Sequence, residues 1–129
     1  MDELLKEIWI PKRKGKWGEI YIKQSYRAAS DIAIVGIAVA LSLNSETHRC
    51  EDIVIAMGAV APIPLRAKEA ETILKGKILK GEIIEDASLA ASKEAEPISD
   101  LRGSAHYRAH LIQSITRSAI TKAIERALD

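Results

Sequence analysis

Residues 32–62 form the most apolar stretch of the chain and constrain its fold more than any other feature. Two runs, IAIVGIAVALSL (32–43) and IVIAMGAVAP (53–62), flank a polar connection, NSETHRCED (44–52). We interpret the runs as two long strands joined by a turn. Large and small side chains alternate along the first run, so one strand face is thick and the other is thin. A strand that is apolar on both faces must be covered on both sides, and we interpret the remaining segments as the covering.

The composition indicates one soluble domain, residues 1–129. Hydrophobic residues make up 47% and aromatic residues 4% of the 129 residues, which predicts an aliphatic core of ordinary size. The net charge of +1 gives no general attraction for nucleic acid or an anionic membrane, and no apolar run is long enough to cross a bilayer as a helix. Cys50 is the single cysteine, and Asp2 and Glu3 stand where a signal peptide would be positive. Both features favour a cytoplasmic location.

The N-terminal region predicts further strands. LLKEIWIP (4–11) reads as a short edge strand ended by proline, or as the end of an element that begins upstream. Three lysines and an arginine follow within residues 12–16, and we interpret them as a solvated loop because no second basic cluster accompanies them. EIYIKQ (19–24) alternates and predicts a third strand. Tyr21 and Lys23 then share one face, and two isoleucines share the other.

The segment after the ribbon predicts a first helix over residues 64–75. Pro64 suits the first turn, and Gly76 is a natural C-terminal stop. Glu71 and Lys75 are spaced to form an ion pair one turn apart.

Two more helices are predicted, over residues 82–95 and 104–128, each with an apolar stripe. Strands followed by helices predict an α+β domain: an antiparallel β-sheet of three to four strands followed by three helices packed on one face. We expect the helices to lie on the small-residue face of the 32–43 strand, because small side chains permit close approach.

Few residues suggest catalysis or metal binding. His106 and His110 are four residues apart on a predicted helix, but no third ligand accompanies them, so we interpret them as surface or interface residues and predict no metal site. Cys50 follows Arg49, which would lower a thiol pKa, and precedes two acidic residues that would raise it. No nucleophile elbow, Walker loop or G-x-G-x-x-G is present. We predict no catalytic residue.

The stretch SDLRGSAHYR contains the densest group of polar residues. Ser99 or Ser104 can cap the last helix, whose first turn has free N–H donors. Asp100, Arg102 and Arg108 can pair with one another or with a partner. We favour a structural network that joins the loop to the helix over a binding site.

The same stretch, extended as SDLRGSAHYRAHLIQSITRSAI, resembles the signature near the C-terminus of flavoprotein subunits in the xanthine dehydrogenase and carbon monoxide dehydrogenase family of molybdenum hydroxylases. SYRAASDIAIVGIAVALSL and CEDIVIAMGAVAPIPLRAKEAETILKGK resemble the same C-terminal domain, in the same order and spacing. Several motifs that agree in order are more specific than any one of them.

The resemblance implies a redox role. In that family the α+β domain follows an FAD-binding part, which accepts electrons from iron–sulfur clusters and passes them to NAD or another acceptor. The resemblance implies that Tyr21 lies near the isoalloxazine ring and Lys23 near its polar pyrimidine edge, where a cation would stabilise negative charge on a reduced flavin. The plain alternative for Lys23 is a solvent-facing strand lysine.

The glycine-rich segments that wrap the FAD pyrophosphate in the family have no counterpart here. We therefore expect FAD to be shared with a partner chain and the isolated chain to be inactive. The expected partners are the FAD-binding half of the flavoprotein and the iron–sulfur and molybdopterin subunits, whether the chain is a split subunit or an excised fragment. The alternative is a stand-alone homo-oligomeric interaction module without redox activity, and a more distant one is phosphate or nucleic-acid binding through residues 12–16.

Overall fold

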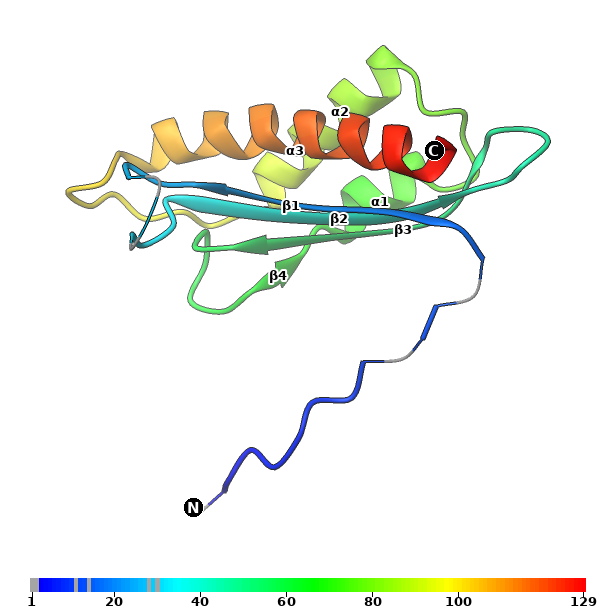
Figure 1. Cartoon of the computed structure of the whole chain (residues 1–129). Helices are drawn as coiled ribbons and strands as arrows, with labels where there is room; N and C mark the ends of the chain where they lie inside the picture. The colour runs from blue at the N-terminus through cyan, green and yellow to red at the C-terminus, as the bar shows by residue number, and fades with distance from the viewer. Residues whose placement is uncertain (1–2, 11, 14, 28, 30) are drawn as a thin grey trace.

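The computed structural model describes residues 3–10, 12–13, 15–27, 29 and 31–129. Within these residues the chain forms two layers, a four-stranded antiparallel sheet and three helices on one face of it (Figure 1). The strands lie in the order β1 (Trp17–Gln24), β2 (Val35–Leu43), β3 (Cys50–Gly58) and β4 (Leu65–Arg66). The helices are α1 (Lys68–Leu74), α2 (Gly81–Glu94) and α3 (Ala105–Leu128). The predicted fold class is confirmed.

The central ribbon is β2 paired with β3, in the register Ile37 opposite Met57 and Val39 opposite Ile55. Both strands differ in their bounds from the prediction: β2 begins three residues later than residue 32, and β3 begins inside the predicted turn. The turn is shorter because Asn44 closes it. Its side-chain oxygen accepts hydrogen bonds from the backbone N–H groups two and three residues further on, at 3.1 and 2.9 Å.

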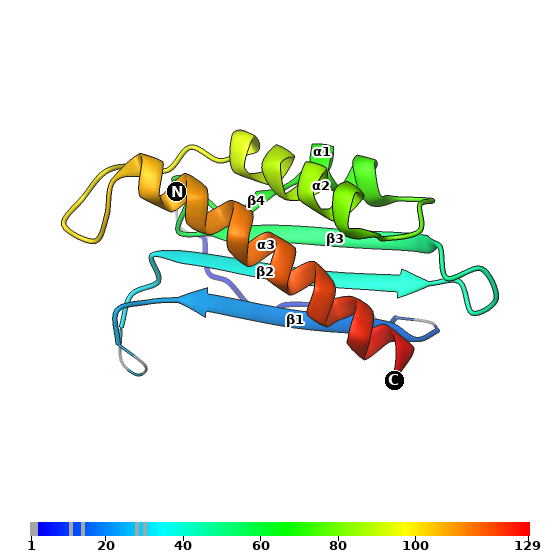
Figure 2. The ribbon, with the colours of Figure 1, turned by 90° about the horizontal axis from the view of Figure 1, so that it is seen from above.

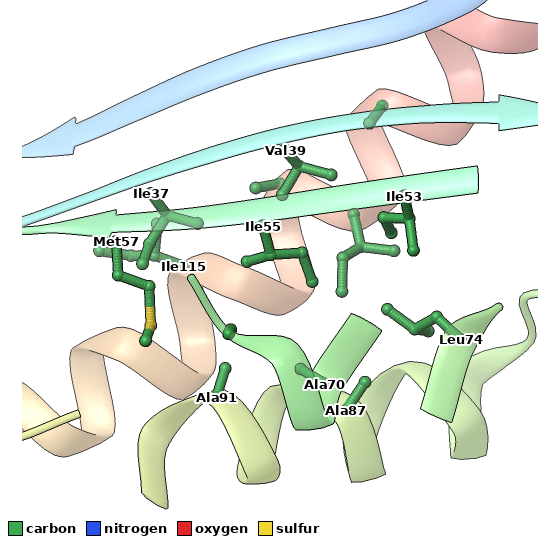
Figure 3. Close-up of a cluster of buried hydrophobic side chains, with 14 of the residues drawn as sticks. Ile37, Val39, Ile53, Ile55, Met57, Ala70, Leu74, Ala87, Ala91 and Ile115 are labelled. Atoms are coloured by element: carbon green, nitrogen blue, oxygen red, sulfur yellow. The ribbon is translucent and has the colours of Figure 1, made fainter. Parts of the chain in front are cut away.

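The bulky residues of the ribbon form the covered face of the sheet. Seven bulky residues of β2 and β3 are at most 2% exposed, and Figure 3 shows several of them meeting residues of the three helices. This set comprises Val35, Ile37, Val39, Leu41, Ile53, Ile55 and Met57, with Ala70, Leu74, Ala87, Ala91 and Ile115 among their helical neighbours. The prediction that the helices pack on the small-residue face is therefore wrong. Burial of large aliphatic side chains gains more free energy than burial of alanine, and this decides which face is covered.

The close approach of helix to sheet occurs on β1 instead. Helix α3 runs diagonally over β1 and β2 (Figure 2). A Cβ atom on Gly18 would lie 1.8 Å from the backbone oxygen of Ala123 and 2.7 Å from the backbone nitrogen of Ala127. Only glycine at this position allows the last turns of α3 to rest on the strand.

Helix α1 is shorter than predicted and begins after a strand. Pro64 lies in the connection before β4, so its predicted place in the first helical turn is wrong. β4 pairs with β3 at Leu65 and Arg66, and this pairing holds the chain extended up to Ala67, which precedes the helix. Gly76 adopts a φ of +76°, which confirms the predicted stop.

The predicted pair of Glu71 with Lys75 is also wrong. Glu71 instead binds Arg66 through two hydrogen bonds of 2.6 and 2.7 Å and accepts a third, of 2.8 Å, from the backbone nitrogen of Ile55. Lys75 binds Asp52 at 2.9 Å. Both side chains reach the sheet, because a partner in a neighbouring element competes with one on the same helix.

The predicted edge strand over residues 4–11 is wrong for the described part, residues 4–10, and its last residue lies outside the described residues. This segment has no regular secondary structure and extends away from the domain (Figure 1). The sheet has β1 at one edge, and the described residues 4–10 do not pair with it. No helix in the described part of the chain is long and apolar enough to span a membrane.

Candidate functional site

The sheet face opposite the helices is the candidate site, and we call it the open face. It carries Tyr21 and Lys23 from β1, Ala38 and Ala40 from β2, and Val54 and Ala56 from β3. The register places Tyr21 opposite Ala38 and Ala38 opposite Ala56, so one aromatic residue stands beside a row of alanines. A shallow depression of about 380 Å³ opens there. Its lining comprises Arg13, Glu19, Ile20, Tyr21, Ala38, Val39, Ala40, Val54, Ala56 and Arg126.

Tyr21 is 61% exposed, and its outer ring atoms rest against Gly36. A Cβ atom on Gly36 would lie 2.7 Å from the Tyr21 hydroxyl oxygen and 3.2 Å from Cε2. Gly36 is opposite Lys23 on the neighbouring strand, one diagonal step from Tyr21. The missing side chain therefore gives the tyrosine room to lie on the sheet, a role that the sequence did not reveal because it depends on a cross-strand neighbour.

Lys23 lies on the same face as Tyr21, as predicted, but outside the depression. Its Nζ donates a 2.5 Å hydrogen bond to the backbone oxygen of Asp31. The Asp31 carboxylate in turn accepts hydrogen bonds of 2.8 Å from the backbone nitrogens of Arg27 and Ile32. The bond from Arg27 is the main reason that the pKa of Asp31 lies below its ordinary value. The loop thus fixes a cation at the β1 end of the open face.

Two arginines, Arg13 and Arg126, line the depression itself. The Arg13 guanidinium is 4.3 Å from the centre of the Trp17 ring, and its Nη1 is 2.9 Å from Oε1 of Glu19. Arg126, in the last turn of α3, donates a hydrogen bond to the backbone oxygen of Glu19. Neither arginine could be assigned to this site from the sequence. Arg13 belongs to the basic run that we interpreted as a solvated loop, and nothing local connects Arg126 with β1.

The polar stretch before α3 forms a structural network. Arg108 is 3% exposed, and its Nη1 donates to the backbone oxygens of Ile34 and Ala59 at 3.2 and 3.3 Å. Its Nη2 lies 2.5 Å from Oδ1 of Asp100, which also forms an ion pair of 3.2 Å with Arg102. The hydrogen bond from Arg108 is the main cause that holds the pKa of Asp100 below its ordinary value. The favoured interpretation, a network that joins loop and helix, agrees with these contacts.

Ser99 and Ser104, the two alternatives for the cap of α3, both accept hydrogen bonds at the start of the helix. The Ser104 hydroxyl oxygen accepts a hydrogen bond of 3.1 Å from the backbone nitrogen of Tyr107, and that of Ser99 accepts one of 2.8 Å from Ala105. Two of the free N–H groups at the helix start are thereby satisfied.

The structure also locates the histidine pair and the cysteine that were considered as metal ligands or a nucleophile. His106 and His110 are exposed, with ring centres 4.5 Å apart, and no cluster of three or more potential metal ligands occurs in the described residues. Cys50 is fully buried, and burial, with a smaller contribution from the Asp52 charge, raises the pKa of its thiol to about 11. A thiol with this pKa stays protonated and is a poor nucleophile.

Comparison with known proteins gives the family. Residues 20–123 match the CO dehydrogenase flavoprotein C-terminal domain. The nicotine 6-hydroxylase medium subunit of Paenarthrobacter nicotinovorans is 36% identical over 122 residues, which cover 95% of this chain and 41% of that subunit. The xanthine dehydrogenase FAD-binding subunit of Escherichia coli O157:H7 is 30% identical over 127 residues, covering 98% of this chain and 43% of the relative.

Comparison with solved structures gives the same family. Carbon monoxide dehydrogenase from Hydrogenophaga pseudoflava superposes with a TM-score of 0.85 at 32% identity, covering 91% of this chain and 40% of that one. The chain therefore belongs to the CO dehydrogenase flavoprotein C-terminal domain family, the C-terminal domain of FAD-binding medium subunits. It spans about two-fifths of the length of the curated relatives that it matches.

Proposed function

We propose that the open face covers one side of the isoalloxazine ring of an FAD that the flavin-binding half of the subunit holds. Tyr21 contacts the ring, and Lys23 lies at its polar pyrimidine edge. The observation that carries this proposal is an exposed aromatic residue beside a nearly flat floor of Ala38, Ala40 and Ala56, on the sheet face that the helices of this chain leave open.

The residues of the open face suit a planar aromatic group. Side chains no larger than valine line much of the floor, so a flat ring can approach the strands closely. Tyr21 supplies the face or edge of an aromatic ring, which favours stacking or edge contacts. The depression is shallow and open, so the chain contacts one side of the ring only. The flavin-binding half holds the other side of the ring and the rest of the cofactor.

Each residue of the open face has a distinct task in this proposal. The alanines exclude water from one side of the isoalloxazine ring. Tyr21 orients that ring, and contact with Gly36 holds the tyrosine side chain in place. Lys23, held by the Asp31 carbonyl, places a positive charge where it favours an electron-rich ring. FAD, when bound, supplies electron transfer between iron–sulfur clusters and a final acceptor.

The partners follow from the same proposal. Relatives of this chain carry names such as medium chain or FAD-binding subunit, and they are more than twice its length. We assign this chain to an oxidoreductase of the molybdenum hydroxylase type, assembled with a flavin-binding half, an iron–sulfur subunit and a molybdopterin subunit. Chemistry on the substrate takes place on another chain.

The test combines the chain with the flavin-binding half produced by the same organism. Flavin retention, fluorescence quenching and reduction potential are measured in the assembled complex. Tyr21→Ala should weaken retention by about 3- to 10-fold, as the loss of one aromatic contact predicts. Lys23→Ala should lower the reduction potential, because a cation that favours an electron-rich ring is removed.

Matched controls lie on the helical side of the sheet. Tyr107 and Lys122 on α3 are exposed residues of the same types, and their alanine variants should leave all three readouts unchanged. Gly36→Ala should act like Tyr21→Ala, because a Cβ atom there displaces the tyrosine ring. If Tyr21→Ala and Lys23→Ala both leave retention, quenching and potential untouched, the assignment of flavin contact is wrong.

One observation favours a second function, a homo-oligomeric interaction module without redox activity. The open face exposes Tyr21 and half-exposes Val54, and a second copy of the chain can cover such a surface. Light scattering distinguishes the two functions. The module requires a stable oligomer that persists when the flavin-binding half is added, whereas the flavin-covering domain passes into a one-to-one complex with that half.

A further inference from the structure

A pair of histidines at the start of α3 takes no part in the proposed function. His106 and His110 are the second and sixth residues of the helix, and both are exposed. They are four residues apart, so their side chains lie one above the other on the same helical face. Their ring centres are 4.5 Å apart, and the ring planes meet at 77°. Imidazole nitrogens are good ligands for divalent transition metals, so such a pair is a candidate chelate.

The separation of the two rings suits two ligands of one metal ion. An imidazole nitrogen binds Zn²⁺ at about 2.1 Å, which places each ring centre about 3.2 Å from the metal. Two rings at neighbouring coordination positions then have centres about 4.5 to 5 Å apart. In the structure the rings meet edge to face. The outermost side-chain bond of histidine rotates easily, so a nitrogen of each ring can turn toward a common point without a change in the helix.

The arginines near the pair are already bound to carboxylates. Arg108 is buried and its Nη2 lies 2.5 Å from Oδ1 of Asp100. Arg117 forms an ion pair of 3.2 Å with Glu85 on α2. Glu85 also lines the same shallow hollow as His110, so a carboxylate lies beside the pair. These two arginines therefore leave little positive charge to repel a metal ion.

The pair supplies two ligands and no more. No group of three or more His, Cys, Asp or Glu side chains that could hold a metal occurs in the described residues. Both oxygens of Glu85 are engaged, one by Gln113 at 2.9 Å and one by Arg117 at 3.2 Å, so we leave it out of the coordination set. Structural zinc sites have four protein ligands, and catalytic ones usually have three. The sequence-based prediction of no metal site rested on that requirement, which a reversible surface site does not have to meet.

We propose that His106 and His110 form a reversible chelating site for a divalent transition metal, with Cu²⁺ bound most tightly and Ni²⁺ and Zn²⁺ less tightly. Each histidine supplies one ring nitrogen, and water fills the remaining positions because both side chains are exposed. The order of the metals follows from the general preference of nitrogen ligands. Ca²⁺ and Mg²⁺ prefer oxygen ligands and should not compete. The site lies on the helical side of the sheet, away from the open face, so it does not depend on the proposed function (Figure 1).

Titration of the purified chain with Cu²⁺ tests the site, with the protein produced without a histidine tag. His106→Ala and His110→Ala should each weaken Cu²⁺ binding at least about tenfold, because a single imidazole lacks a second ligand at high effective concentration. His48→Ala is the matched control. His48 is the third histidine of the chain, and it is exposed in the turn between β2 and β3, so its loss should change the affinity less than about twofold. Circular dichroism of the three variants should be unchanged, because all three side chains are exposed.

A relocated histidine separates chelation from the number of histidines. The double variant His110→Ala/Ser114→His keeps three histidines but spaces the two on α3 eight residues apart, or about 12 Å along the helix. Ser114 is exposed, so the helix accommodates the new side chain. This variant should bind Cu²⁺ as weakly as His110→Ala does. Electron paramagnetic resonance of the Cu²⁺-loaded wild type should show coupling to nitrogens of two imidazoles, and that of the double variant coupling to one.

The pattern of affinities decides the proposal. The site stands if both single α3 variants and the double variant lose affinity while His48→Ala keeps it. It is overturned if the wild type binds Cu²⁺ no more tightly than His110→Ala, if His48→Ala loses as much affinity as the α3 variants, or if the double variant binds like the wild type. Coupling to one imidazole alone in the wild type would also overturn it, since the pair is then a ring contact that shares no metal.

Discussion

The two faces of the sheet use the same strands for different purposes. On β2, Ile37 and Val39 point toward the helices and are at most 1% exposed, whereas Ala38 and Ala40 between them are only partly buried. The covered face supplies the core, and the open face supplies a flat surface that this chain alone leaves uncovered. Large and small side chains alternate along the strand. The large ones stabilise the core, and the small ones form a surface suited to binding.

Glycine illustrates the same division. Gly18 faces the helices, and its missing side chain allows the backbone of α3 to rest on β1. Gly36 faces the other way, and its missing side chain gives space to Tyr21. The first glycine is needed for packing between layers, and the second shapes a surface. A substitution at each should therefore have a different consequence.

The largest effect is expected at Gly18. Gly18→Ala should lower the free energy of unfolding by at least about 3 kcal/mol, because the new Cβ meets backbone atoms that cannot rotate away. Chemical denaturation of the purified chain measures the change. Gly58→Ala is the control, since nothing lies within 4 Å of a Cβ at that position, and it should change stability by less than about 1 kcal/mol. Equal losses at the two positions would contradict the close contact of α3 with β1.

A smaller effect is expected from truncating neighbours on β3 that face opposite ways. Ile55→Ala should cost about 3 kcal/mol, because the side chain is fully buried in the core. Val54→Ala should cost less than about 1 kcal/mol, because this side chain lines the open face. Thermal or urea unfolding of both variants tests the contrast. A Val54 variant as unstable as the Ile55 variant would show that the open face is covered within the isolated chain.

The smallest effect is expected from acid, at the ion pairs. The pKa of Asp100 is lowered in the folded chain, so its contribution to stability is present above the unfolded pKa, near 4, and is lost as the pH falls through the folded value. Asp100→Asn should therefore be less stable than the wild type at pH 7, and this difference should shrink between about pH 5 and about pH 2.

Asp52→Asn is the matched control for this comparison. Asp52 also has a lowered pKa, caused mainly by its hydrogen bond with Lys75, but the side chains of that pair are 48% and 60% exposed. Arg108, the partner of Asp100, has a side chain that is only 4% exposed. The loss at pH 7 should be larger for Asp100→Asn, because the exposed pair is screened by solvent. Equal losses of stability in the two variants would mean that burial of Arg108 does not strengthen its ion pair with Asp100.

Much of the fold could be predicted from local patterns. The sequence pattern located β1, β2 and β3 and correctly placed Tyr21 and Lys23 on one face, since a period of two depends only on the strand itself. It did not predict β4, and the strand that it predicted at residues 4–10 is absent. The predicted helix over 104–128 nearly coincides with α3, because Ser104 provides a clear start signal. The covered face was predicted wrongly because alternation defines two faces without stating which one is buried.

The features that the sequence did not predict depend on contacts between segments that are distant in sequence. Glu71 and Lys75 have the spacing of a helical ion pair, yet each binds a residue of the sheet instead. At the candidate site, Arg126 reaches the backbone of Glu19 across 107 residues of sequence, which no local pattern can reveal. The apolar run at residues 4–10 was recognised as strand-like, but a strand also requires a neighbour, and the sequence does not contain that information.

The buried state of Cys50 has a practical consequence. Because the thiol is inaccessible and its pKa is about 11, maleimides and nitroxide reagents will not label it in the folded chain at neutral pH. A cysteine introduced at Ala38 would then be the only site that such reagents modify. Distances from a spin label at that point, measured in the free and assembled states, would report directly on what approaches the alanine floor.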